Sequence, residues 1–195
     1  MPSRDYFSLF GLELKLELDL NDLQRRFYEL SRQWHPDRFS RKSAAEQQEA
    51  LDMTSAVNDG YRTLKDPIKR AEYVLAAAGF PIGEQRSKDV PPELLEEVFE
   101  LNMMLEEIKT GDDSSRPQLE RAREHFLELR RGADRELQAQ FAAHDAAGAS
   151  SENGRKALQA IRGVLNRRRY IENLIREVER ALQPVEVETA STTTV

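Results

Sequence analysis

The chain has 195 residues, a formal net charge of −6 and 39% hydrophobic residues, which is enough to bury a core and too apolar for a disordered chain. It contains no cysteine, which excludes disulfides, thiolate nucleophiles and metal clusters ligated by its own thiolates. No apolar run approaches the roughly 20 residues that span a membrane, and the negative charge argues against nucleic acid as the main partner. The first residues have neither a signal core nor an Arg-rich presequence, so we expect a cytoplasmic protein with no membrane partner.

Glycine and proline divide the sequence at a few places. The strongest internal break is Gly79-Phe80-Pro81-Ile82-Gly83, which Pro91-Pro92 follows. We therefore predict a first domain over residues 1–79, a linker over 80–91 and a second domain over 92–183. The last residues, 184–195, are rich in Thr, Ser and Glu, and we expect them to form a disordered tail.

The spacing of apolar residues predicts helices almost throughout. A helix over 21–34 has one apolar face, formed by Leu23, Phe27, Leu30 and Trp34. Asn21 and Gln24 have the spacing of an N-terminal capping box. Further helices are expected over 43–64 and 68–78, and three more after residue 91. Because no segment alternates with period two for long enough to form a sheet, the predicted fold class is all-α: an N-terminal helical hairpin and a C-terminal three-helix bundle.

The two long N-terminal helices are joined through a turn that contains His35, Pro36 and Asp37. Pro36 disfavours helical geometry at His35 and fixes its own φ, so the turn is stiff. It presents an imidazole and a carboxylate beside a helix rich in arginine. From these residues alone three interpretations stay open: an ordinary loop in which Asp37 caps the next turn, an acid–base pair, and a docking surface.

The residues around this turn resemble a J-domain, the module that activates DnaK-type chaperones. The shared motifs occur in the family's order: Asp5-Tyr6-Phe7-Ser8-Leu9-Phe10-Gly11-Leu12, the basic helix over 23–34, His35-Pro36-Asp37-Arg38-Phe39, the segment from Val57 to Pro67, and Lys69-Arg70-Ala71-Glu72-Tyr73. The resemblance covers residues 4–78. Gly60 departs from it, because the family often has alanine there, and glycine should weaken the helix by about 1 kcal/mol.

The resemblance implies roles for the matched residues. His35, Pro36 and Asp37 would contact the ATPase domain of the chaperone and favour its hydrolysis-competent state, while the J-domain itself does no bond chemistry. Four arginines would meet acidic residues of the chaperone, which would make association faster and salt-sensitive. They are Arg25, Arg26, Arg32 and Arg38. The alternative for these arginines is a solvated helix face.

The segment 92–109 carries two apolar rows. A core seam is expected from Leu94, Val98, Leu101, Leu105 and Ile108, which lie within one arc of a helix. A second row lies outside this arc and is flanked by Glu96, Glu100 and Glu107. It consists of Leu95, Phe99 and Met103. Two interpretations remain open: a strip that binds a basic partner, and a helix that is buried on more than one side.

The whole arrangement resembles HscB-type co-chaperones of iron–sulfur cluster assembly. The motifs that carry this resemblance are Arg70-Ala71-Glu72-Tyr73-Val74-Leu75 with Gly79-Phe80, and Leu105-Glu106-Glu107-Ile108. The resemblance spans residues 4–183 and implies two partners, an HscA/DnaK-type chaperone and an IscU-type scaffold protein.

By motif position, the scaffold-binding residues would be Leu95, Phe99, Glu100, Glu107 and Tyr170. Glu96 and Met103 would join them, at positions where the family can carry other residue types. The resemblance implies no cofactor and no enzymatic activity. Two alternatives remain, a J-domain protein with a different client and a small enzyme that uses His35 and Asp37 as an acid–base pair.

Overall fold

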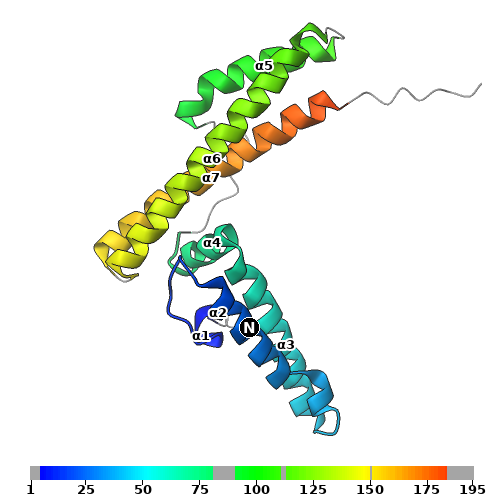
Figure 1. Cartoon of the computed structure of the whole chain (residues 1–195), viewed down its shortest axis with the longest axis vertical. Coiled ribbons are helices and arrows are strands. Elements are labelled where there is room, and N and C mark those ends of the chain that lie inside the picture. Colours follow the sequence, from blue (N-terminus) through cyan, green and yellow to red (C-terminus); the bar gives the residue numbers. More distant parts are fainter. Residues whose placement is uncertain (1–4, 81–90, 111–112, 150, 184–195) are drawn as a thin grey trace, which may run out of the picture. The chain divides into compact units, whose positions relative to one another are not determined.

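The computed structural model describes residues 5–80, 91–110, 113–149 and 151–183. These residues form helices and connecting turns without any strand, which confirms the predicted all-α class (Figure 1). Residues 81–90 of the predicted linker and the predicted tail 184–195 lie outside the described residues. None of the described helices is both long enough and apolar enough to cross a membrane.

The N-terminal helices are built around an antiparallel pair. The elements are α1 (Tyr6–Leu9), α2 (Leu20–Gln33), the 3₁₀ helix η1 (Pro36–Phe39), α3 (Ala44–Lys65) and α4 (Pro67–Ala77). Helices α2 and α3 lie side by side and are joined through η1 (Figure 1). The core between these helices is apolar and includes Phe7, Phe10, Leu23, Val57, Leu64, Val74 and Leu75.

Helix starts follow the local sequence, with one correction. The predicted capping box of Asn21 and Gln24 is wrong, because Asp19 caps α2 and accepts from the backbone N–H of Asn21 at 2.9 Å. The same Oδ1 of Asp19 also accepts from the backbone N–H of Asp22 at 3.3 Å, and Asn21 already lies inside the first turn. A capping box does occur at the start of α3, where Ser43 and Glu46 bond reciprocally.

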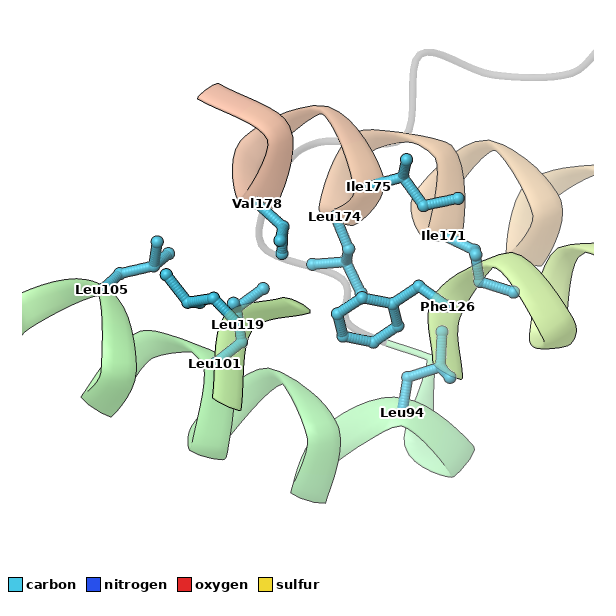
Figure 2. Close-up of a cluster of buried hydrophobic side chains, with 9 residues drawn as sticks. All are labelled: Leu94, Leu101, Leu105, Leu119, Phe126, Ile171, Leu174, Ile175 and Val178. Atoms are coloured by element: carbon cyan, nitrogen blue, oxygen red, sulfur yellow. The ribbon is translucent and has the colours of Figure 1, made fainter. Parts of the chain in front are cut away.

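Three helices follow residue 91 and share a second core. The elements are the 3₁₀ helices η2 (Pro92–Leu94) and η3 (Asp113–Ser115), with α5 (Leu95–Lys109), α6 (Arg116–Ala147) and α7 (Glu152–Leu182). Their buried side chains point toward one another (Figure 2). The cluster consists of Leu94, Leu101, Leu105, Leu119, Phe126, Ile171, Leu174, Ile175 and Val178.

The contacts divide the chain into two compact units. The first contains the described residues of Met1–Glu84 together with Arg135–Leu165, and the second those of Gln85–Asp134 together with Asn166–Val195. The end of the α6–α7 hairpin therefore belongs with the N-terminal helices. Within this first unit, the Asp145 carboxylate accepts from the backbone N–H groups of Leu16 and Glu17, both at 2.8 Å. The buried His144 lies against the same carboxylate, with Nδ1 2.9 Å from Oδ1.

Candidate functional site

The turn with His35, Pro36 and Asp37 follows the end of α2 and includes the start of η1. Helix α2 ends at Gln33, because a proline at 36 disfavours helical geometry at the residue before it. His35 adopts φ −59° and ψ 127° and becomes the N-terminal cap of η1. The backbone N–H of Arg38 donates to the His35 carbonyl at 3.0 Å, which closes the turn.

The His35 imidazole takes part in the hydrogen bonding of the turn. Its Nδ1 accepts from the backbone N–H of Asp37 at 3.3 Å. Because Nδ1 is used as an acceptor, a neutral His35 carries its proton on Nε2, where it is available to donate outward. The side chains of His35 and Asp37 are 58% and 90% exposed. The turn therefore presents an N–H donor and a carboxylate to solvent on a fixed backbone.

The four predicted arginines differ in what they contact. Arg25, Arg32 and Arg38 are exposed, whereas Arg26 is half-buried. Arg25 pairs with Asp22 on the same helix. The guanidinium of Arg38 reaches back from η1 and donates to the Arg32 carbonyl at 3.2 Å. The structure thus brings Arg32 and Arg38 together at the end of α2, next to the turn.

Arg26 closes the junction between α1 and α2. Its Nη1 donates to the carbonyls of Phe10 and Gly11, both at 2.9 Å, and its Nε donates to Asp22 at 2.8 Å. These carbonyls follow the last turn of α1, where backbone acceptors lack partners within the helix. Hydrogen bonds from Arg25 first, and then from Arg26, hold the pKa of Asp22 below its ordinary value. Arg26 therefore has a structural role that its sequence position did not indicate.

The second apolar row of α5 is exposed. Leu95, Phe99 and Met103 have exposed fractions of 56, 66 and 53%, whereas Leu101 and Leu105 of the predicted seam are buried. The other helices of its own unit therefore do not bury this row. Residues at i, i+4 and i+8 are neighbours on a helix surface, so the three side chains form one row. An exposed apolar helix row is typical of a partner-binding helix.

The carboxylates near this row are in different situations. Glu107 accepts a hydrogen bond from the Ser115 hydroxyl, so its carboxylate already helps to hold the turn after α5. Glu96 and Glu100 are exposed on either side of Phe99 along the helix. These two carboxylates are the ones best placed to meet basic groups on a partner that covers the row.

Tyr170 lies at the edge of the core rather than fully on the surface. It packs against the buried cluster, and burial, followed by the charge of Glu177, raises the pKa of its hydroxyl. Arg167 precedes Tyr170 by about one helical turn, and its Nη1 lies 3.4 Å from Oε1 of Glu93. Glu93 is two residues before Leu95. The structure therefore brings this part of α7 beside the start of α5.

A groove of about 310 Å³ runs between α5 and α6. Its lining consists of Glu97, Glu100, Met104, Gln118, Arg121, Ala122, His125 and Phe126. Because Glu100 belongs to the groove and also flanks the exposed row, the two features adjoin. His35 and Asp37 do not line this groove.

The chemistry of these surfaces is that of protein contacts. Within the ranges that the structure describes, no group of three or more His, Cys, Asp or Glu side chains could hold a metal ion. The turn offers an imidazole N–H and a carboxylate on a stiff backbone, and α5 offers an apolar row beside carboxylates. We interpret both as surfaces for binding other proteins.

Sequence reasoning missed residues that act on the backbone of other segments. Asp19 could have been found, because an aspartate directly before an amphipathic helix is an N-cap signal. Arg26 and Asp145 could not have been found this way. The acceptors of Arg26 are carbonyls 15 and 16 residues away, and the donors to Asp145 are amides 128 and 129 residues away.

Each half of the chain matches a known domain family. Residues 5–73 match the DnaJ domain, and residues 90–179 match the HSCB C-terminal oligomerisation domain. The matched segments contain the His35-Pro36-Asp37 turn and the exposed row of α5, respectively.

Solved structures agree with these matches. The chaperone HscB from Vibrio cholerae is 30% identical, with a TM-score of 0.64 over 90% of this chain and 96% of that one. The human co-chaperone protein HscB has a TM-score of 0.67 over 92% of this chain and 83% of that one, and at 24% identity it supports the fold. With its J-domain motifs, its helical C-terminal domain and this likeness over nearly the whole length, the chain belongs to the HscB family of J-domain co-chaperones.

Proposed function

We propose that this protein is an adaptor that binds an IscU-type iron–sulfur scaffold, delivers it to an HscA/DnaK-type chaperone and stimulates the ATPase of that chaperone. The observation that carries the proposal is the stiff, exposed His35-Pro36-Asp37 turn of a J-domain, in one chain with an exposed apolar row on α5. The expected compartment is the cytoplasm, and the adaptor needs no cofactor of its own.

At the chaperone end, the turn acts by contact. Because Nδ1 of His35 accepts from the Asp37 amide, the imidazole is held with Nε2 outward, and the exposed Asp37 carboxylate can accept from a donor of the chaperone. Arg32 and Arg38 add positive charge beside the turn, and Arg25 adds it nearer the start of α2, which should raise the association rate at low salt. Arg26 contributes through the J-domain fold.

At the client end, the exposed row of α5 supplies the apolar anchors. Leu95, Phe99 and Met103 would fill shallow pockets of the scaffold, and Glu96 and Glu100 would meet its basic residues. The half-buried Tyr170 and the partly engaged Glu107 would lie at the margin of this surface. Linking both binding surfaces in one chain raises the effective concentration of the scaffold at the chaperone.

A single-turnover ATP hydrolysis assay tests the chaperone half. The chaperone is mixed with this protein, with the scaffold, or with both, and the series is repeated with His35→Gln. We expect stimulation that is synergistic with the scaffold and lost in the variant. If an active chaperone shows no stimulation by the wild-type protein, the co-chaperone proposal is refuted for that pair.

A binding titration tests the client half. Phe99→Ala removes an anchor that is 66% exposed, and Leu51→Ala removes a side chain of α3 that is 51% exposed, so the second variant is a matched control. We expect Phe99→Ala to weaken scaffold binding by roughly tenfold or more, as removal of an interface anchor does, with no change for Leu51→Ala. Unchanged binding by Phe99→Ala would refute this row as the scaffold-binding surface, and no scaffold binding by the wild-type protein would favour a J-domain protein with a different client.

The enzyme alternative is not supported by the geometry. An acid–base pair works in a concave site from which water can be excluded. His35 and Asp37 are largely exposed, and the groove between α5 and α6 is lined by other residues. Docking to a second protein is the activity that this turn supports best.

A further inference from the structure

The turn that carries His35, Pro36 and Asp37 is held between two aromatic residues. Trp34 caps the end of α2 and Phe39 ends η1. Their rings are stacked, with centroids 5.8 Å apart and planes 5° from parallel. His35, Pro36 and Asp37, together with Arg38, therefore lie between two side chains that stack on each other.

A threonine of α3 anchors the same place from the other helix. The half-buried Thr54 donates its hydroxyl to the Trp34 carbonyl at 2.9 Å. This carbonyl belongs to the last turn of α2, where backbone acceptors have no partner within the helix. It is also part of the peptide unit that leads directly into His35. The hydrogen bond thus ties the first peptide of the turn to α3.

The position of this contact matters because the rest of the turn is already stiff. Pro36 fixes its own φ, and it restricts the backbone of His35 as well. A rotation of the peptide between Trp34 and His35, where the turn leaves α2, would reorient this stiff turn as a whole. A hydroxyl that pins the carbonyl of this peptide therefore sets the direction in which the turn is presented.

We propose that Thr54 is a positioning residue for the chaperone-binding turn: its hydroxyl, through the Trp34 carbonyl, preorganises His35, Pro36 and Asp37 for docking. This inference rests on the proposed function. Without the hydrogen bond the turn populates other orientations, and the chaperone then binds only the competent fraction. The net worth of one neutral hydrogen bond corresponds to a roughly two- to tenfold change in an equilibrium constant.

Three variants of α3 test the role of the hydroxyl. Thr54→Val keeps the shape and removes the donor, whereas Thr54→Ser keeps the donor. Thr63→Val is the matched control, because Thr63 is a second half-buried threonine of the same helix. Far-UV circular dichroism verifies that each full-length variant is folded. Should Thr54→Val fail to fold, Thr54→Ala replaces it as the variant without a donor.

The first readout is a titration of chaperone ATPase stimulation. We expect Thr54→Val to raise the concentration that gives half-maximal stimulation by roughly two- to tenfold, at an unchanged maximum, because the competent orientation is still accessible. Thr54→Ser and Thr63→Val should follow the wild type. A Thr54→Val titration that coincides with that of Thr63→Val overturns the proposal, and so does a Thr54→Ser titration that coincides with that of Thr54→Val.

The second readout needs no partner. Trp34 is the single tryptophan of the chain, so its emission and its quenching by acrylamide report directly on this site. We expect both to change in Thr54→Val and to stay at the wild-type values in Thr54→Ser and Thr63→Val. An unchanged Trp34 signal in Thr54→Val overturns the proposal. If the wild-type protein gives no stimulation at all, the proposed function fails, and the Trp34 signal still decides whether Thr54 holds the turn.

Discussion

Alanine at position 60 should destabilise the J-domain, although glycine is a poor helix former. Gly60 lies inside α3 and is buried against α1. A Cβ at this position would lie 2.9 Å from Cε2 of Phe10 and 3.0 Å from Cδ1 of Tyr6. Carbon atoms in contact are normally about 3.5–4.0 Å apart, so both rings would have to move.

Neither ring can move at low cost. Phe10 is 3% exposed, and Tyr6 stacks on Tyr73 with ring centroids 4.9 Å apart. The backbone N–H of Tyr6 also donates to the Tyr73 hydroxyl at 3.0 Å. Overpacking of this kind costs about 1–3 kcal/mol, while alanine gains about 1 kcal/mol in helix propensity over glycine. Because the steric cost exceeds the propensity gain over most of this range, we expect Gly60→Ala to lower the free energy of unfolding by up to about 2 kcal/mol.

Urea unfolding followed by Trp34 emission and by far-UV circular dichroism measures this change. The control is Gly163→Ala in α7, where an added Cβ meets nothing within 4 Å. That variant should be stabilised by about 1 kcal/mol, because only the propensity term acts. If Gly60→Ala stabilises the protein as much as Gly163→Ala does, the steric argument is refuted and α1 does not pack against Gly60 as described.

Further predictions concern polar contacts of the first unit. Arg26→Gln should lower the free energy of unfolding by about 1–3 kcal/mol, because two carbonyls lose a charged donor. The same substitution should leave the salt dependence of chaperone stimulation unchanged. Stopped-flow measurements of association at several salt concentrations check this second expectation. Asp145→Ala should speed hydrogen exchange at the two amides that it accepts from, as measured by NMR or mass spectrometry. The pKa of Asp5 is lowered, chiefly by the hydrogen bond from the Ser8 hydroxyl, so its stabilising contribution is present above its ordinary pKa of 3.8 and is lost as the pH falls through the lower folded value. Urea midpoints of the wild type and Asp5→Ala should therefore differ at pH 6 and converge in stronger acid.

Much of the helical architecture could be predicted from periodicity and from proline. Leu101 and Leu105 were expected in the seam of α5 and are buried, while Phe99 was placed outside that seam and is exposed. The end of α2 could be placed because Pro36 disfavours helical geometry at His35. These features depend on residues that are close in sequence, so the amino-acid sequence alone is sufficient to predict them.

Contacts between distant segments could not be predicted in the same way. The resemblance assigned Arg26 to the chaperone, but its guanidinium binds carbonyls of the α1 end. Gly60 was expected only to weaken a helix, and its role in admitting two rings of α1 depends on how α1 and α3 cross. Thr54 lies next to the inner face of α3, and no sequence pattern indicates that it has a role. Each of these roles depends on the tertiary packing of helices, which the spacing of residues does not encode.

The contact between Asp145 and the segment before α2 affects whether J-domains can be exchanged between members of the family. The donors are the main-chain amides of Leu16 and Glu17, and every residue except proline supplies such a donor. The segment can therefore diverge in sequence during evolution without losing the contact, whereas the residue at 145 cannot. A J-domain from another family member, joined to the α6–α7 hairpin of this protein, should keep the two hydrogen bonds to Asp145. It would lose one of them if it brought a proline to position 16 or 17.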